Sequence, residues 1–149
     1  ILREHGYTYD SSLFSFGAHE RYAKMELPED TSEGTTFAFQ YPNGIREIPL
    51  LTRRVFGMEL PWGGGGYFRL FPPGVFRRGF GKAARERGGG VFYIHPWEID
   101  PGQPRMTGLP RSYGFRHYVN LEKAEERLRT LCQTYSFTSF ETVITNGGV

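Results

Sequence analysis

The sequence has a single cysteine, Cys132, among its 149 residues. An internal disulfide and a metal site built from several thiolates are therefore both excluded. The four histidines, His5, His19, His95 and His117, lie far apart and form no His-x-x-x-His motif, so we expect no complete metal site in this chain. No apolar run approaches the ~18 residues that a membrane-spanning helix needs, and no secretory leader is recognisable.

The longest glycine run, Gly63 to Gly66 in PWGGGGYFRL, lacks the features that a phosphate-binding loop requires. The run does not end in Gly-Lys-Ser or Gly-Lys-Thr, as a P-loop would. A dinucleotide-binding G-x-G-x-x-G motif would need a strong helix after it, and the sequence predicts none there. Two interpretations remain open. The glycines let the backbone approach a ligand or another strand beside Tyr67 and Arg69, or they form a flexible hairpin turn. A Ser–His–Asp hydrolase is also unsupported, because YDSS at residues 9–12 is not part of a nucleophile elbow.

Aromatic residues make up 16% of the chain, and the hydrophobic content of 38% is sufficient for one domain with its own core. These aromatic side chains could stack on sugars or on bases. The formal net charge is +2, but residues 53–87 hold eight Arg and Lys against two Glu. This basic block could face an anionic partner, or it could be a solvated helix face of long cationic side chains.

Strand and helix patterns alternate along the chain, which predicts an α/β fold. Residues 1–7 resemble the last turn of a helix that Gly6 ends, and because the chain starts at Ile1 we expect it to be a piece of a longer protein. A short strand is predicted within YTYDSSLF, and residues 15–44 predict a long surface loop with a short strand near TTFAFQYP. Residues 45–57 predict a strand that Pro49 confines to an edge or a bulge.

Three helices are predicted from apolar residues at helical spacing. The first begins at Pro72, and its apolar stripe consists of Val75, Phe76, Phe80, Ala83 and Ala84. The second begins at Asn120 as N-cap, and one face holds Leu121, Ala124, Leu128, Leu131, Cys132 and Tyr135. The third is short and lies near the end of the chain, with Phe140, Val143 and Ile144 on one side.

The segment VFYIHPWEID, residues 91–100, predicts a buried strand that ends at a histidine. Branched and aromatic residues at 91–94 favour a strand after the preceding glycines. Pro96 has no N–H to donate to a sheet, so the chain leaves the sheet there and His95 lies at its carboxyl edge, where α/β folds build their sites. His95 is therefore a candidate for acid–base chemistry, and a packed structural histidine is the alternative.

Five strings of this sequence, in this order, resemble polysaccharide deacetylases of the NodB-homology type, in particular the subgroup linked to exosortase-associated exopolysaccharide loci. They are YDSSLF, REIPL, GGGGYFRL, FYIHPWEIDPGQPRM and FRHYVNLEKAEERLRTL. The resemblance runs from residue 1 to about 145, with a subgroup-specific region at about 91–145. It implies that residues 1–149 are the C-terminal portion of one deacetylase domain, part of a distorted (β/α) barrel whose N-terminal strands are missing.

The resemblance implies a role for His95 but leaves most of the family's catalytic motifs unmatched. In that family an Asp and two His hold a divalent cation, usually zinc, and all of those motifs would lie upstream of this chain. By resemblance His95 is the general acid that protonates the leaving amine. Trp97 and Glu98 would shape the sugar pocket or support His95, and Tyr67, Arg69 and Asp10 are weaker candidates for substrate contact.

We therefore expect part of a metal-dependent hydrolase that removes N-acetyl groups from amino sugars of a bacterial exopolysaccharide. The chain alone should be inactive and should hold no cofactor or metal. The expected partner is an N-acetylated polysaccharide, without nucleic acid or a membrane span, and the oligomeric state is left open. Two alternatives remain. One is a metal-free carbohydrate-binding module that uses its aromatic residues, and the other is a nucleic-acid binder built on residues 53–87.

Overall fold

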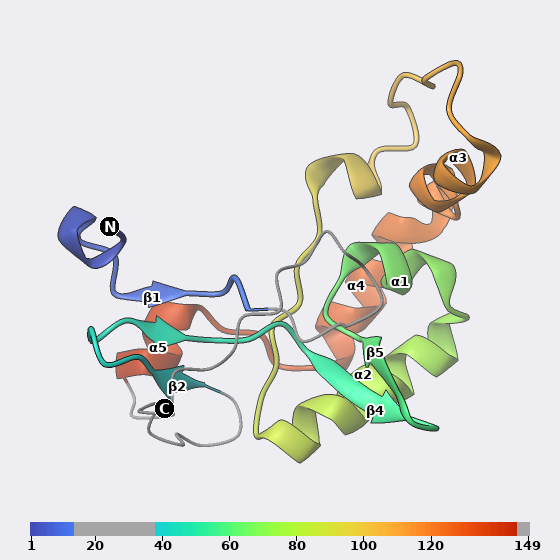
Figure 1. The fold of residues 1–149 in the computed structure, drawn as a ribbon. Coiled ribbons are helices and arrows are strands. Elements are labelled where there is room, and N and C mark those ends of the chain that lie inside the picture. The colour runs from blue at the N-terminus through green and yellow to red at the C-terminus, as the bar shows by residue number, and fades with distance from the viewer. Residues whose placement is uncertain (14–37, 146–149) are drawn as a thin grey trace.

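The computed structural model describes residues 1–13 and 38–145, which form a mixed α/β fold (Figure 1). The strands are β1 (Tyr9–Asp10), β2 (Phe39–Gln40), β3 (Arg46–Glu47), β4 (Thr52–Val55) and β5 (Met58–Pro61). The α-helices are α1 (Gly65–Leu70), α2 (Pro73–Arg87), α3 (Arg111–Tyr118), α4 (Ala124–Thr134) and α5 (Phe140–Thr145). Three 3-10 helices complete the order: η1 (Arg3–His5), η2 (Pro96–Ile99) and η3 (Leu121–Lys123).

The described strands form two small sheets. In the first, β3 lies between β1 and β2, parallel to β1 and antiparallel to β2. The second is the antiparallel hairpin of β4 and β5. Figure 1 shows the three-stranded sheet with α5 at one end of the molecule and the hairpin with α1, α2 and α4 at the other. The fold is therefore α/β, as predicted, and no closed barrel is seen among the described residues.

Pro49 divides the strand that the sequence predicts over residues 45–57. The segment is split into β3 and β4, because proline cannot donate a ladder hydrogen bond. The two strands then belong to different sheets. The short strands predicted within YTYDSSLF and near TTFAFQYP are confirmed as β1 and β2, and the helical turn before Gly6 is confirmed as η1. The predicted surface loop at residues 15–44 lies mostly outside the described residues.

Residues 91–94 are extended but do not form the regular strand that the sequence predicts. Val91 forms an isolated parallel bridge with Leu50, and Tyr93 forms one with Gly64. The partner of Tyr93, Gly64, lies in the glycine run. The glycines therefore let a neighbouring extended segment come close, and they do not themselves form a hairpin turn. The prediction of a hairpin turn at Gly63 to Gly66 is wrong, because α1 begins at Gly65.

The main core lies between β4, β5, α1, α2 and α4. Its buried residues are Leu51, Trp62, Phe68, Phe76, Phe80, Ala83 and Leu131. Phe76 and Phe80 stack with ring centroids 6.1 Å apart, and Phe76 also meets Phe68 edge to face. The predicted stripe of α2 is thus mostly confirmed. Val75 is the exception, since it is 51% exposed and lies outside the core.

The predicted helix after Asn120 is present but begins later and differs in two positions. Asn120 has a left-handed backbone with φ of 53° and makes no capping bond, and its side chain instead donates to the carbonyl of Arg69 at 2.8 Å. The turn η3 comes first, and α4 begins at Ala124. Cys132 is exposed, so the packing role predicted for it is wrong. The short helix predicted near the end of the chain is confirmed as α5.

Candidate functional site

His95 ends the extended segment and stands just before η2, whose first residue is Pro96. The backbone N–H of His95 donates to Oε2 of Glu98 at 3.0 Å. The ring Nδ1 of His95 lies 3.1 Å from the same oxygen. One turn of 3-10 helix brings Glu98 back over His95, because residues three apart lie on the same side of such a helix. The carboxylate of Glu98 therefore holds both the backbone and the ring of His95.

Glu98 is buried and also pairs with a buried arginine. Its Oε1 accepts a hydrogen bond from Nη2 of Arg69 at 2.9 Å, and both side chains are almost fully buried. A buried carboxylate needs a compensating charge and several hydrogen bonds, and here Arg69 and the two nitrogens of His95 supply them. By contrast the side chain of His95 is 54% exposed. The pair thus forms an interior support for a ring that reaches solvent.

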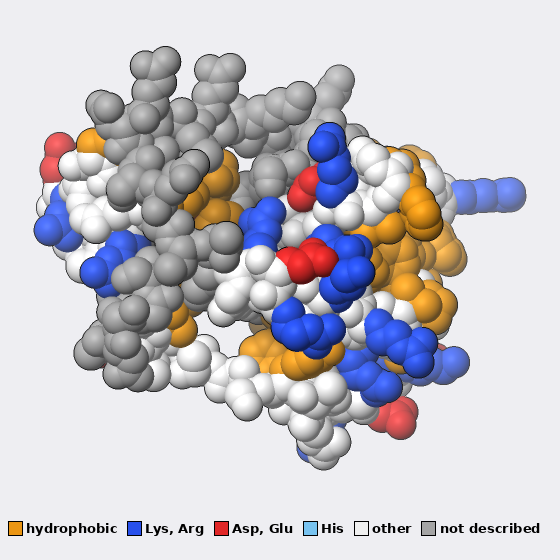
Figure 2. All heavy atoms as spheres, turned by 90° about the horizontal axis from the view of Figure 1, so that it is seen from below, with side chains coloured by type: hydrophobic (Ala, Val, Ile, Leu, Met, Phe, Trp, Pro, Cys, Tyr) orange, Lys and Arg blue, Asp and Glu red, His pale blue; other side chains and the backbone are white. Residues whose placement is uncertain are grey.

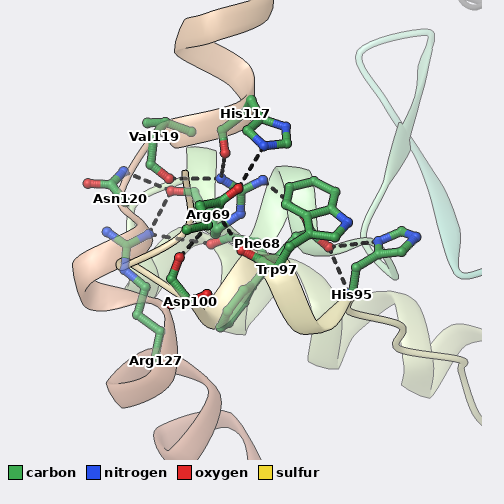
Figure 3. Close-up of polar contacts among 11 residues, drawn as sticks. Phe68, Arg69, His95, Trp97, Asp100, His117, Val119, Asn120 and Arg127 are labelled. Atoms are coloured by element: carbon green, nitrogen blue, oxygen red, sulfur yellow. Dashed lines mark hydrogen bonds and ion pairs between the residues drawn. The ribbon is translucent and has the colours of Figure 1, made fainter. Parts of the chain in front are cut away.

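Three rings stack on one another beside this ion pair (Figure 3). The rings of Trp97 and His117 are nearly parallel, with centroids 4.4 Å apart. The ring of His95 also stacks on Trp97, with centroids 5.4 Å apart, so Trp97 is the ring that both histidines contact. The guanidinium of Arg69 lies 5.6 Å from the centroid of the Trp97 ring. Since Trp97 is 37% exposed, the stack is a partly open aromatic surface next to a histidine.

Arg69 is fixed by the last turn of α3 and the residue after it. Its Nη1 donates to the backbone carbonyls of His117 at 2.8 Å and Val119 at 3.1 Å. Figure 3 shows the Arg69 guanidinium between these carbonyls and the ring of Trp97. The end of α1 is held from the other side, where Arg127 donates to the carbonyl of Arg69 at 2.7 Å. Arg69 therefore joins α1, η2 and the end of α3.

Gly65 explains how α1 and η2 come so close. A Cβ atom on Gly65 would collide with the carboxylate of Glu98, whereas a Cβ on neighbouring Gly66 would meet nothing within 4 Å. The absence of a side chain at residue 65 thus leaves the space in which the Glu98 carboxylate lies. This confirms that the glycines permit a close approach, although the approaching groups belong to the chain itself.

His117 is a site residue that the sequence analysis did not assign to the site. It lies in α3, a helix that was not predicted, and its Nε2 lies 2.8 Å from Oε1 of Gln103. Gln103 in turn donates to the carbonyl of Trp97 at 2.6 Å. Pro110 before the helix and the basic residues of its last turn were the available indications of α3. The contact between His117 and Trp97 could not be read from the sequence, because it depends on the tertiary fold.

The structure brings together four of the six candidate residues and separates the other two. His95, Trp97, Glu98 and Arg69 form one connected cluster, as described above. The side chains of Glu98 and Arg69 are too deeply buried to touch a polymer, so they position His95 and Trp97 instead.

The two remaining candidates lie apart from this cluster. Tyr67 is half-buried on α1, where its ring meets that of Phe71 at a centroid distance of 5.7 Å. Asp10 lies in β1, in the three-stranded sheet, which Figure 1 shows away from η2. Its Oδ1 accepts from the backbone N–H of Ser11 and the hydroxyl of Ser12, as in an Asx turn. The structure therefore gives Asp10 a local structural role.

The contacts of His95 define what its ring can do. A carboxylate accepts hydrogen bonds, so the pairing with Glu98 favours the tautomer that carries its proton on Nδ1. Nε2 is then the atom that can take or give a proton at the exposed side of the ring. A histidine held by a carboxylate in this way is suited to acid–base catalysis.

A metal site in the His95 cluster or elsewhere among the described residues would need several donor side chains placed close together. Residues 1–13 and 38–145 contain no group of three His, Cys, Asp or Glu side chains arranged to hold a metal ion. We therefore assign no metal ligand among these residues. Within the same residues, no helix combines the length and the apolar character that a bilayer crossing requires.

Comparison with known proteins places the chain in one family. A family model described as "Domain of unknown function (DUF3473)" matches residues 11–145. No curated protein and no solved structure matches the chain. Because the matched segment covers most of the 149 residues, the chain belongs to the family described as Domain of unknown function (DUF3473).

Proposed function

We propose that this chain supplies the general acid of a polysaccharide deacetylase that hydrolyses N-acetyl groups of amino sugars in a bacterial exopolysaccharide. The observation that carries the proposal is the exposed ring of His95 held at Nδ1 by the buried Glu98–Arg69 pair. The partly exposed stack of His95, Trp97 and His117 supports it further, because aromatic faces pack well on sugar rings.

The proposed architecture is the C-terminal portion of a distorted (β/α) barrel of the NodB-homology type. Strands in such barrels are parallel and are followed by helices. Two observations support this architecture. The strands β1 and β3 are parallel, and the extended segment at residues 91–94 makes parallel bridges to Leu50 and Gly64. His95 follows directly from that segment, at the end where barrel enzymes place their catalytic residues.

The proposed step is protonation of the leaving nitrogen. After water has added to the acetyl carbonyl carbon, the C–N bond breaks and the nitrogen receives the bonding electron pair. A base in the longer protein takes one proton from the attacking water, and the protonated Nε2 of His95 donates its proton to the leaving nitrogen. The second proton of the water also ends on that nitrogen, so the products are acetate and the ammonium form of the amino sugar, and His95 is left neutral. Glu98 stays ionised and keeps the ring oriented throughout.

The resemblance to deacetylases implies a divalent cation, usually zinc, but the described residues do not fit one. No described group of side chains could hold a metal ion, so we route no step through a metal. For the same reason we propose that this chain alone is inactive and acts as part of a longer deacetylase. Kinetic tests therefore require a protein that contains this segment together with the residues the segment lacks.

The catalytic test is His95→Ala in such a longer deacetylase, assayed on an N-acetylglucosamine oligomer. We expect kcat to fall by about 10²- to 10⁴-fold, the range for loss of a general acid, with the fold unchanged. His5→Ala is the matched control, because His5 is exposed in η1 and makes no contact with the site. Near-normal turnover by the His95 variant, together with loss of turnover on His117→Ala, would show that the role of His95 is assigned wrongly.

A second function is favoured by one observation, the open aromatic stack. The chain could bind an N-acetylated polysaccharide as a metal-free module, with the exposed ring of His95 and the open edge of Trp97 as the contact surface. Titration of the 149-residue chain with N-acetylglucosamine oligomers tests this function. It is followed by tryptophan fluorescence and compared with the Trp97→Phe variant, which separates the signal of Trp97 from that of buried Trp62. Tight binding by the chain, together with normal turnover by the His95→Ala deacetylase, would favour the module.

The nucleic-acid alternative rests on the basic side chains of α2. Figure 2 shows Lys and Arg side chains gathered on the face seen from below, where α2 lies. The basic residues of α2 are Arg77, Arg78, Lys82, Arg85 and Arg87. Arg53 of β4, also in the basic block at residues 53–87, is already paired, because its side chain lies 2.7 Å from the carboxylate of Glu86 on α2. A steep salt dependence of RNA or DNA affinity would support this alternative over the two carbohydrate functions.

A further inference from the structure

A pocket of about 340 Å³ lies between α2, α4 and the last turn of α1, apart from the His95 cluster. Its floor is apolar and consists of the core side chains of Phe68, Phe76 and Leu131. Its walls are polar and include Thr130 and Glu126 of α4. A concave site with an apolar floor and a few polar groups, at the small end of the usual size range, suits a small ligand.

The walls carry more positive than negative charge. Arg77, Lys123 and Arg127 line the pocket, with Glu126 as the one acidic residue among the described lining side chains. Over residues 1–13 and 38–145, no ion pair joins Arg77, Lys123 or Arg127 to an acidic side chain. The other basic residues of α2, Arg78, Lys82, Arg85 and Arg87, add positive charge to the helix that carries Arg77. The pocket thus offers three cations that form no ion pair with an acidic side chain of the described residues.

Arg127 is the innermost of these cations. Its Nη1 donates to the carbonyl of Arg69 at 2.7 Å and, at 3.4 Å each, to those of Phe68 and Phe71, all at the end of α1. Burial lowers the pKa of Arg127, because the charged guanidinium is partly withdrawn from water. Backbone carbonyls solvate this charge but do not neutralise it. An anion in the pocket would compensate it at short range.

The remaining wall groups indicate what kind of anion would fit. Thr130 donates its hydroxyl to the carbonyl of Glu126 at 3.0 Å, so its oxygen can still accept a hydrogen bond. The carboxylate of Glu126 can accept others. Sugar hydroxyls can donate to both groups in place of the water that reaches these exposed side chains, whereas a purely hydrocarbon acid cannot. The apolar floor would contact the C–H face of the sugar ring.

We propose that this pocket binds one negatively charged monosaccharide unit, either a uronate or a sugar phosphate. The acidic group lies between Arg77 and Lys123, with Arg127 beneath it, and the hydroxyls meet Thr130 and Glu126. This site is separate from the His95 cluster and does not depend on the deacetylase proposal. The two sources share one chemistry, an anionic group on a pyranose ring.

The test is an NMR titration of the 149-residue chain with glucuronate, glucose 6-phosphate, glucose and inorganic phosphate, followed at the amides of Lys123 and Thr130. We expect saturable shifts with at least one of the two anionic sugars. Saturation by glucuronate alone would identify the uronate of a polymer as the source, and saturation by glucose 6-phosphate alone would identify a free sugar phosphate. Glucose and phosphate should bind at least about tenfold more weakly, a difference of about 1.4 kcal/mol.

The matched variants change exposed charges, so the fold should be kept. Arg77→Gln combined with Lys123→Gln should weaken binding of the anionic sugar about tenfold, and Lys82→Gln, on the same helix but outside the pocket, should change it less than about twofold. Three outcomes would overturn the proposal. They are no saturable binding of either anionic sugar, equal binding of glucose or phosphate, and an equal effect of the Lys82 variant.

Discussion

The carboxylate of Glu98 lies 2.9 Å from the guanidinium of Arg69, and the two residues are 29 positions apart in the sequence. Both side chains are almost fully buried, so the ion pair is withdrawn from solvent on every side. Glu98 uses its second oxygen to hold His95. The orientation of an exposed ring thus depends on an interaction inside the molecule.

Removing one partner of this pair should strongly destabilise the fold. We expect Arg69→Met to lower the free energy of unfolding by about 3–5 kcal/mol, because it leaves the buried Glu98 carboxylate without its guanidinium partner. Urea denaturation measures the change. The exposed pair of Arg129 and Glu125 provides the control, and Arg129→Met should cost less than about 1 kcal/mol. Equal losses in the two variants would contradict a special role for the buried pair.

Gly65 and Gly66 give a sharper comparison, because they are neighbours with different surroundings. Gly65→Ala places a methyl group against the Glu98 carboxylate and should destabilise the chain by about 1–3 kcal/mol. Gly66→Ala meets nothing and should be neutral or stabilising by up to about 1 kcal/mol, since alanine favours a helix. Thermal unfolding distinguishes them. An unchanged Gly65→Ala variant would show that η2 can move away from α1 at little cost.

The turn of the β4–β5 hairpin places a phenylalanine, Phe56, in a left-handed backbone conformation that this residue type disfavours. Phe56 has φ of 49° and is 98% exposed, and Gly57 beside it has φ of 79°. Asparagine tolerates this conformation much better than phenylalanine and is the preferred residue before glycine in such two-residue turns. We expect Phe56→Asn to stabilise the chain by about 0.5–1 kcal/mol. Phe56→Leu is the control and should give no gain in the melting temperature.

Glu47 should make stability depend on pH. Burial raises the pKa of Glu47, which is 1% exposed, while the hydrogen bond from the backbone N–H of Leu13 opposes the shift. A raised pKa in the folded state means that the contribution of this group to stability is fully present below its ordinary value. That contribution is lost as pH rises through the raised value. The ionised form therefore costs stability at neutral pH.

Replacing Glu47 by glutamine separates charge from hydrogen bonding. Glu47→Gln keeps an acceptor for the N–H of Leu13 and removes the buried charge, so the free energy of unfolding at pH 7 should rise. The variant should also flatten the increase in stability that the native chain shows as pH falls towards the ordinary glutamate range. Urea denaturation across this range measures both effects. The exposed Glu122→Gln should leave the pH profile unchanged, and a similar change in both variants would argue against burial as the cause.

Local patterns predicted the elements whose residues interact within a turn or two. The stripe of Phe76, Phe80 and Ala83 predicted α2, and the position of His95 after an apolar run placed it at the end of an extended segment. The contact between His95 and Glu98, three residues apart, is also local, but it was expected only from the resemblance, as one of two roles for Glu98. These features depend on helical periodicity and turn chemistry, which a sequence displays directly.

The remaining features depend on contacts between distant segments. Arg69 was predicted as a weaker candidate for substrate contact, and Glu98 as a residue that shapes the sugar pocket or supports His95. Nothing local could show that the two pair with each other and are buried. The strand at residues 91–94 was overestimated, because its partners near Leu50 and Gly64 offer only single bridges. Cys132 follows Leu131 on α4, but α4 is covered on one side only, so Leu131 is buried and Cys132 faces solvent.

Because α1 is short, the chain should not tolerate insertions or deletions within this helix. Successive residues of a helix differ in direction by about 100°, so Phe68 points into the core while Arg69, next to it, points to Glu98. One residue inserted or deleted within α1 would rotate Arg69 away from Glu98 and move Phe68 out of the core at the same time. Related chains should therefore keep the length of α1 and place insertions elsewhere, for example at the exposed tip formed by Phe56 and Gly57.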